Sequence, residues 1–291
     1  MNSRLTPPSP VLYDHLILTA LREDLGVAGD LTTEATVSAG ARGEASIGTR
    51  ATGVVAGIEV AARAFTLFDP EVIVDVLIGD GARVAPGDVI ARVVGPARAI
   101  LTAERTALNL LGRLCGIATL TASVVEAVAG TGASVVCTRK TTPGLRVLEK
   151  YAVRAGGGAN HRFGLGDAVL VKDNHIAFAG GLLPALAGVR ERIGHLTMVE
   201  VEVESLVQLE ELLTLRALGY PVNAVLLDNF DPDQLRAAVE TVAGAILTEA
   251  SGGIGPGTAR AVAETGVDLL SLGWLTHSAT VLDVGLDVEP G

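Results

Sequence analysis

Aromatic residues are scarce in this chain of 291 residues, since Phe, Trp and Tyr together make up 3% of it, whereas hydrophobic residues of all kinds make up 49%. The core must therefore be aliphatic. Only 19% of the residues are charged, so the chain has ample material for a core and is not intrinsically disordered. The length fits one large domain or two of moderate size.

Cysteine is almost absent: Cys115 and Cys137 form neither a disulfide framework nor a zinc pattern, and we expect two buried, reduced thiols. No apolar run reaches the roughly 18 residues of a membrane span. No cationic leader with a small-residue cleavage site precedes residue 12. These absences favour a cytoplasmic location.

Positive charge is in deficit overall, because the chain carries a formal net charge of −11. That balance argues against nucleic acid or an anionic membrane as a partner. The exception is residues 137–175, the basic segment, where seven Lys or Arg face three acids. A cationic segment in an acidic protein indicates a small anionic ligand.

The first third of the chain mixes helical and strand patterns. We expect helices at 11–25, 58–68 and 103–129, strands at 44–51 and 72–78, and a loop at 29–33. Residues 79–95 predict two short strands around Gly and Pro turns, a hairpin that resembles the fold of biotinyl and lipoyl carrier domains. Such carriers need a lysine at the turn, and residues 69–95 contain none, so we expect shared architecture without carrier function.

Beyond residue 130, short buried-type strands alternate with helices, which implies parallel strands joined by crossovers. The absence of a dinucleotide glycine fingerprint favours an α/β barrel over a Rossmann sheet. The strands are expected at 134–138, 167–172, 197–203, 223–228, 244–249 and 267–271, and the helices at 143–155, 181–193, 205–218, 231–241 and 257–265.

The helix at 143–155 has a clear predicted start, with Thr142 as N-cap and Pro143 in the first turn. One face, with Leu145, Leu148 and Ala152, is expected to be buried, and Arg146, Glu149 and Lys150 are expected to face away. Arg139 and Lys140 then lie at the carboxyl end of a strand, where barrel active sites are found.

Acidic residues mark the third and fourth predicted strands. Glu200, Glu202 and Glu204 alternate with valines and share one face. If that face is the barrel interior, we expect them to neutralise cations such as Lys172; the alternative is a polar edge strand. Glu202 and Asp228, at neighbouring strand ends, suit Mg²⁺, held in large part through substrate and water oxygens. The alternative for Asp228 is a helix cap.

Glycines follow the last two predicted strands, at Ser251-Gly252-Gly253 and Leu272-Gly273. Such loops bind phosphate through backbone N–H groups in α/β barrels. Arginine binds planar carboxylates in a bidentate manner, which makes Arg105, Arg139 and Arg162 candidates for a carboxylate or dicarboxylate site. Lys140 and Lys172, as compact charges, suit phosphate oxygens. For each cation the alternative is a surface ion pair.

Taken together, these motifs closely resemble the quinolinate phosphoribosyltransferase family. The resemblance covers nearly the whole chain, in segments that begin at Glu104, Thr138, Glu149, Gly156, Asn160, Lys172, Glu200, Leu227, Glu249 and Thr276. It implies an N-terminal open-faced α+β sandwich domain, residues 1–110, with the tail 277–291 as a candidate to join it. It also implies an incomplete, seven-stranded α/β barrel, residues 111–276. Trp274 and Gly255-Pro256-Gly257 depart from the family pattern.

The resemblance also implies the reaction: quinolinate and phosphoribosyl pyrophosphate give nicotinate mononucleotide, pyrophosphate and CO₂, a step of NAD biosynthesis. By resemblance, Thr138, Arg139, His161, Arg162 and Lys172 bind quinolinate together with Arg105 from the neighbouring subunit of a homodimer, which can assemble further. Lys140 would neutralise pyrophosphate, and Glu202 and Asp228 would hold Mg²⁺ and the ribose. Ser251-Gly252-Gly253 and Leu272-Gly273 would bind the 5-phosphate.

Three other readings stay open from the sequence. A paralogous group associated with molybdate transport shares this architecture. A Schiff-base lyase on the same barrel would use Lys140 or Lys172 as its nucleophile. A non-catalytic carrier would use the hairpin at 79–95.

Overall fold

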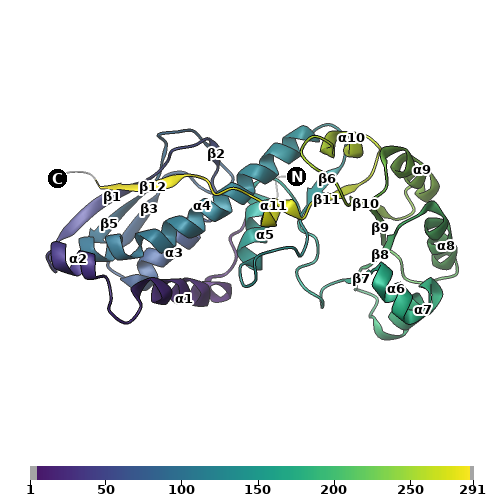
Figure 1. Cartoon of the computed structure of the whole chain (residues 1–291), viewed down its shortest axis with the longest axis horizontal. Coiled ribbons are helices and arrows are strands. Elements are labelled where there is room, and N and C mark those ends of the chain that lie inside the picture. Colours follow the sequence, from purple (N-terminus) through teal and green to yellow (C-terminus); the bar gives the residue numbers. More distant parts are fainter. Residues whose placement is uncertain (1–4, 289–291) are drawn as a thin grey trace. The chain divides into compact units, whose positions relative to one another are not determined.

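A computed structural model describes residues 5–288, which form two compact units (Figure 1). The N-terminal unit contains the residues up to Ala122, Lys140–Gly158 and the residues from Trp274 onward. The barrel unit contains Ser123–Arg139 and Ala159–Gly273. The boundary therefore falls between Arg139 and Lys140, inside the basic segment.

The N-terminal unit is built on a four-stranded antiparallel sheet in the order β12-β1-β5-β3. Residues alternate between buried and accessible along β1, where Ala45, Ile47 and Thr49 are buried, so one face of the sheet is packed. The strands are β1 (Arg42–Thr49), β2 (Gly53–Val54), β3 (Ile73–Val76), β4 (Arg83–Val84), β5 (Val89–Pro96) and β12 (Val284–Val288). The C-terminal tail thus supplies an edge strand of this sheet.

Helices complete the N-terminal unit, with the fully buried Ile17 and Phe65 in its core (Figure 1). They are η1 (Pro10–Leu12), α1 (Asp14–Leu25), α2 (Leu31–Thr36), α3 (Ile58–Phe68), α4 (Ala97–Ala127), α5 (Arg146–Ala155) and α11 (Trp274–His277). By length and composition α4 could cross a membrane, but 61% of its most apolar window is buried inside the protein, as in the core helix of a soluble protein.

Two N-terminal predictions are wrong. Residues 31–36 form a helix rather than a loop, because the Asp30 side chain accepts a hydrogen bond from the Thr33 N–H at 2.9 Å and caps it. Residues 79–95 do not form a hairpin, since β4 pairs with β2 while β5 lies between β1 and β3. The resemblance to a carrier domain therefore does not extend to strand pairing.

The predicted start and buried face of α5 are also wrong. The helix begins at Arg146, after Gly144 with φ +84°, a left-handed conformation that interrupts helical backbone. Thr142 is not its N-cap. Leu148 and Ala152 are buried as expected, but so are Glu149 and Lys150, each with no exposed surface.

The barrel unit contains a six-stranded parallel sheet in the order β6-β11-β10-β9-β8-β7, with helices along its outer side (Figure 1). The strands are β6 (Ser134–Val136), β7 (Val169–Val171), β8 (Val199–Val203), β9 (Ala224–Asp228), β10 (Leu247–Ser251) and β11 (Leu269–Ser271). The helices are α6 (Asp173–Ala179), α7 (Leu182–Arg192), α8 (Leu206–Ala217), α9 (Pro232–Val242) and α10 (Ala259–Ala263). All six predicted strands and the crossover helices are confirmed.

The sheet curls as an incomplete α/β barrel does, because its first strand in chain order, β6, pairs with its last, β11. On the other side of β6, Ala159 makes a parallel bridge with Val136, and Ala159 and Val135 share a hydrogen bond of 2.8 Å. This one-residue bridge occupies the position of a seventh strand. The loop that follows it, residues 160–168, leads to β7 and carries Arg162.

Candidate active site

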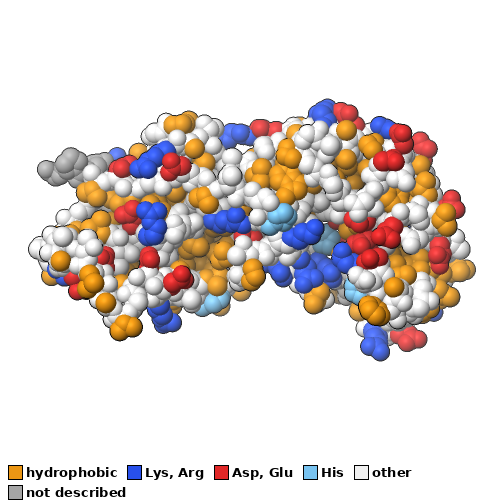
Figure 2. Space-filling model, in the orientation of Figure 1, with side chains coloured by type: hydrophobic (Ala, Val, Ile, Leu, Met, Phe, Trp, Pro, Cys, Tyr) orange, Lys and Arg blue, Asp and Glu red, His pale blue; other side chains and the backbone are white. Residues whose placement is uncertain are grey.

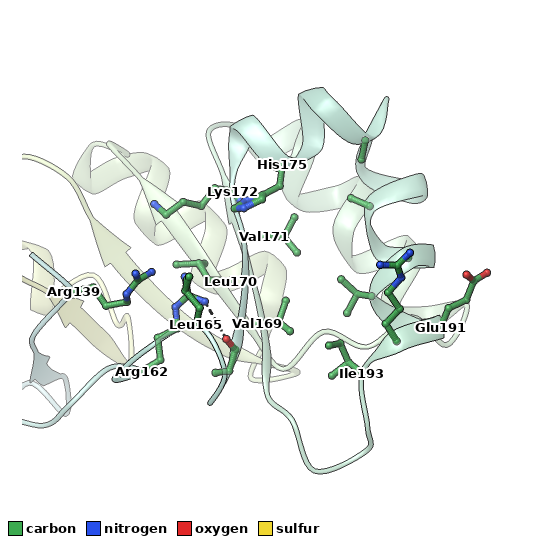
Figure 3. Close-up of a pocket in the computed structure, with 16 residues that line it drawn as sticks. Arg139, Arg162, Leu165, Val169, Leu170, Val171, Lys172, His175, Glu191 and Ile193 are labelled. Atoms are coloured by element: carbon green, nitrogen blue, oxygen red, sulfur yellow. Dashed lines mark hydrogen bonds between the residues drawn. The ribbon is translucent and has the colours of Figure 1, made fainter. Parts of the chain in front are cut away.

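Arg139 and Arg162 line one pocket in the barrel unit, with a cavity volume of about 730 Å³ (Figure 3). Arg139 lies in the segment after β6. Arg162 lies in the loop before β7, where its Nη1 donates to the Ala168 carbonyl at 3.0 Å. Figure 3 shows the two guanidinium groups side by side, with Lys172 extending to the same side. The structure therefore brings together three of the predicted cations.

Arg162 lies among charges of both signs, since Asp167 and Glu200 favour its charged form and Arg139 opposes it. Burial, followed by the charge of Arg139, lowers the pKa of Arg162. Among the described residues, the buried Nε atoms of both arginines have no hydrogen-bond partner. Buried donors are normally satisfied, so an anion with several acceptor oxygens is the ligand that this pair fits.

Lys172 follows β7, and its Nζ lies 2.7 Å from Oε2 of Glu202 on β8. Glu202 is buried, so its carboxylate needs this cation. The predicted pairing of a barrel glutamate with Lys172 is thus present, although Lys172 itself is exposed and is not an interior cation. Figure 2 shows basic side chains gathered beside acidic ones on this part of the molecule. Glu204, beyond the end of β8, is exposed.

Asp228 ends β9 and does not cap the next helix, because Asp231 is the N-cap of α9. This excludes the helix-cap alternative for Asp228. In the register of the sheet Asp228 pairs with Ser251, and the Gly252-Gly253 turn begins there. Gly252 has φ +88°, and a Cβ there would lie 2.1 Å from Asn229 Oδ1, so only glycine fits. The acid and the predicted phosphate loop are therefore neighbours.

The remaining predicted residues are divided between the two units. Thr138 is half-buried beside Arg139, while Leu272 and Gly273 follow β11, where the Leu272 N–H bonds the Val136 carbonyl at 3.0 Å. Lys140 is exposed and belongs to the N-terminal unit. Arg105, on α4 of that unit, is 63% exposed, 3.8 Å from Glu104.

His161 is held by two hydrogen bonds inside the barrel unit. Its Nδ1 accepts from the Arg162 N–H at 2.8 Å, so Nε2 carries the proton and donates to Oε2 of Glu200 at 2.8 Å. The Nε2 atom also lies 3.7 Å from Oε1 of Glu249. A quinolinate carboxylate would have to displace one of these partners to reach the ring.

Glu249 is a site residue to which sequence reasoning gave no role. It lies on β10 in register with Leu226, which is in register with Glu202, so these side chains share one face of the sheet. The sequence does contain one signal for such a role, because Glu249 is an acidic residue in a run that is otherwise typical of a buried strand. Its side chain is 2% exposed, and Oε1 has no hydrogen-bond partner among the described residues.

His161, Glu200 and Glu249 place their ligand atoms within 4.8 Å of one another, a spacing that a metal ion could use. The tautomer of His161 argues against a metal, because a ligating Nε2 needs its lone pair and here carries the proton. The cluster instead favours protonation of one carboxyl. Burial, followed by the charge of Glu200, raises the pKa of Glu249 to about 7.

Glu249→Gln is therefore expected to stabilise the protein at high pH and not at low pH. The folded protein holds this proton up to about pH 7, whereas the ordinary value is 4.5, so wild-type stability falls as the pH rises through that range. At pH 8 the gain from Gln should be of order 1 to 3 kcal/mol, and at pH 4 it should vanish. Urea unfolding across this range measures it.

The control is Glu240→Gln, at an exposed residue of α9. It should leave the free energy of unfolding unchanged at every pH. A Glu249→Gln protein that is less stable than wild type at pH 8 would show that the folded protein favours the ionised carboxyl, so that folding does not raise the pKa of Glu249.

Comparison with known proteins supplies relatives over nearly the whole chain. Residues 30–115 match the family model of the quinolinate phosphoribosyl transferase N-terminal domain, and residues 117–287 match that of the C-terminal domain. The chain is 47% identical over 280 residues to a nicotinate-nucleotide pyrophosphorylase (carboxylating) of Mycobacterium leprae, covering 94% of this chain and 95% of the relative. It is 43% identical over 277 residues to a probable enzyme of the same name from Bacillus subtilis, covering 95% and 92%.

Solved structures agree with these relatives. The crystal structure of NadC from Streptococcus pyogenes has a TM-score of 0.91 and 42% identity, and the match covers 98% of this chain and all of that one. The nicotinate-nucleotide pyrophosphorylase of Francisella tularensis has a TM-score of 0.92 and 33% identity, with 99% and 100% covered.

Proposed function

The chain belongs to the quinolinate phosphoribosyltransferase family, and we propose that Arg139 and Arg162 hold the carboxylates of quinolinate in the pocket that they line. The observation that supports this most strongly is the buried pair of unpartnered arginine Nε atoms. Two guanidinium groups side by side suit a ligand with two adjacent carboxylates. A single carboxylate would leave one of them without an anion.

The enzyme joins quinolinate to phosphoribosyl pyrophosphate and releases pyrophosphate and CO₂, which gives nicotinate mononucleotide for NAD synthesis. The pyridine nitrogen already has a lone pair, so its attack on ribose C1 needs no activated Ser or Cys. As pyrophosphate leaves, positive charge develops at C1, and we assign Glu202 and Asp228 to that side of the site. The ribosylated nitrogen is then cationic. Its positive charge stabilises the electron pair that stays at ring C2 when the bond to the carboxylate breaks and CO₂ leaves, and that pair then takes up a proton.

The chain's own residues act mainly by position and charge. Arg139 and Arg162 orient the ring, Lys140 lowers the negative charge of the leaving pyrophosphate, and Lys172 is shared between quinolinate and pyrophosphate. The turn at Gly252-Gly253 presents backbone N–H groups toward the 5-phosphate. Both glycines have left-handed backbone, and a Cβ at Gly253 would meet nothing within 4 Å, so space is open beside the turn.

Mg²⁺ fits the donors present at the ends of β8 and β9, since both are carboxylates. Glu202 is paired with Lys172, and Oδ2 of Asp228 accepts from Asn229 Nδ2 at 2.6 Å. Both carboxylates would be ligands, with water and phosphate oxygens as the rest. When bound, Mg²⁺ would screen the charge of the pyrophosphate.

Asp228→Asn is accordingly expected to raise the Mg²⁺ concentration needed for half-maximal turnover, since a neutral amide is a weaker ligand than a carboxylate. A Mg²⁺ titration at fixed substrate measures the shift. Glu210→Gln, at an exposed residue of α8, is the matched control and should not move the midpoint. If both variants titrate like wild type, Asp228 is not a metal ligand.

A homodimer is part of the proposal, with Arg105 completing the neighbouring subunit's site. Its support is the 63% exposure of the Arg105 side chain, which leaves the guanidinium accessible to a second chain. A cytoplasmic location is also proposed, and the two free, buried cysteines accord with a reducing compartment. A Schiff-base lyase is disfavoured because Lys140 and Lys172 are exposed and Lys172 is ion-paired, whereas that chemistry needs a desolvated amine.

Turnover with two competing pyridines tests the assignment of the pocket. With Mg²⁺ and phosphoribosyl pyrophosphate, purified protein should release CO₂ and nicotinate mononucleotide from quinolinate. Nicotinate, which lacks the second carboxylate, should not be used. Efficient use of nicotinate would mean that the arginine pair does not select a dicarboxylate.

A further inference from the structure

The short segment Lys140-Thr141-Thr142 is held at each of its three residues within the N-terminal unit. The Lys140 carbonyl accepts a hydrogen bond from Thr276 Oγ1 at 2.8 Å. The Thr141 hydroxyl accepts from Arg146 Nε at 2.9 Å. The N–H and hydroxyl of Thr142 both donate to Glu149, at 3.0 and 2.8 Å. The backbone is thus fixed, while the Lys140 side chain is exposed.

Behind these contacts lies a buried ion pair. Arg113 on α4 donates to Glu149 at 2.8 Å, and the same guanidinium donates to the backbone carbonyls of Thr276 and, at 3.2 Å, Ala279. Arg113 therefore connects the residue that holds Lys140 to the residue that holds Thr142. We call Arg113, Glu149 and Thr276 the Lys140 clamp.

The residues of the clamp are largely buried, so losing any one of its hydrogen bonds would leave a buried polar group without a partner and lower the stability of the fold. Glu149 and Thr276 have no exposed surface, and the Arg113 side chain is 22% exposed. A buried carboxylate is retained only with its charge paired and its oxygens bonded. Both oxygens of Glu149 are used, because besides Arg113 they accept from the hydroxyl and the N–H of Thr142, two residues after Lys140. An aliphatic residue at position 149 would pack α5 without fixing that backbone.

We propose that Thr276, supported by Arg113 and Glu149, is a positioning residue that fixes the backbone of Lys140, whose ammonium group the proposed function assigns to the departing pyrophosphate. The inference rests on the role of Lys140 in the proposed function. The clamp does not touch substrate. It fixes the backbone from which the flexible Lys140 side chain extends. The side chain therefore loses less conformational entropy when it is ordered in the transition state.

Thr276→Val tests the clamp with little change of volume, since it removes the hydroxyl and keeps the β-branched shape. We expect kcat to fall about tenfold and quinolinate binding to stay unchanged, because small misplacements of a catalytic group lower the rate steeply. Thr276→Ser keeps the hydroxyl and should retain wild-type kcat. Quinolinate affinity is measured without phosphoribosyl pyrophosphate.

A double-mutant cycle with Lys140→Ala separates positioning from a merely structural role. Lys140→Ala should lower kcat, and adding Thr276→Val should lower it no further. An equal fall in the Lys140→Ala background, a Thr276→Ser protein as slow as Thr276→Val, or full activity of Thr276→Val would each overturn the inference. If Lys140→Ala itself is fully active, the proposed role of Lys140 is wrong, and the inference fails with it.

Thr142→Val and Thr142→Ser provide the same test at an exposed residue, should Thr276→Val fail to fold. The valine variant removes the hydroxyl contact to Glu149 and should lower kcat by a smaller factor, again without effect in the Lys140→Ala background. An additive effect there contradicts the inference.

Discussion

Arg139→Ala is expected to weaken quinolinate binding at least about a hundredfold, about 3 kcal/mol, because it removes a charged bidentate donor from a partly desolvated pocket. Phosphoribosyl pyrophosphate binding should change far less, since its pyrophosphate and 5-phosphate are assigned to Lys140, Lys172 and the Gly252-Gly253 turn. Calorimetric titration of each substrate separately measures both affinities.

Two control variants sharpen this result. Arg139→Lys keeps the charge and loses the planar fork, so its quinolinate affinity should lie between those of wild type and Arg139→Ala. Arg236→Ala, at an exposed residue of α9, should bind both substrates normally. Equal losses of both substrates in Arg139→Ala would refute a specific carboxylate role for Arg139.

Two inactive variants are expected to restore activity when they share a dimer. If Arg105 acts in the neighbouring subunit, a heterodimer of Arg105→Ala and Arg139→Ala has one site with neither change and one site with both. Purified through two different affinity tags, it should have about half of the wild-type activity, as symmetry requires.

The parent homodimers provide the comparison, because every site in them lacks one arginine. A heterodimer no more active than its parents would mean that Arg105 serves its own subunit. Restored activity would also establish the dimer itself, because the active site of the heterodimer then needs one arginine from each chain.

Much of the barrel is predictable from the sequence because its strands and helices are locally consistent. All six strands lie where buried-type runs occur, and the pairing of Lys172 with Glu202 follows from strand-end positions. The burial of Glu149 and Lys150 could not be predicted in the same way. A helical pattern marks charged residues as outward-facing, and only tertiary partners such as Arg113 make their burial tolerable.

Contacts between distant segments explain several features that the sequence pattern did not predict, and one local cap explains another. The pairing of β4 with β2 rather than β5 depends on long-range contacts that a two-strand pattern does not encode. The helix at Leu31–Thr36 depends on one side-chain cap from Asp30. Burial, followed by the charge of Glu200 on another strand, raises the pKa of Glu249, and Nε2 of His161 donates to Glu200, 39 positions away.

A crystal structure of the protein with quinolinate, in the absence of phosphoribosyl pyrophosphate, tests the central claim most directly. We predict that the two carboxylates lie against the guanidinium groups of Arg139 and Arg162, at nitrogen–oxygen distances of about 2.7–2.9 Å. Both arginine Nε atoms should then be satisfied or shielded from water by the ligand. Quinolinate bound elsewhere, with the arginine pair still without an anion, would contradict the account.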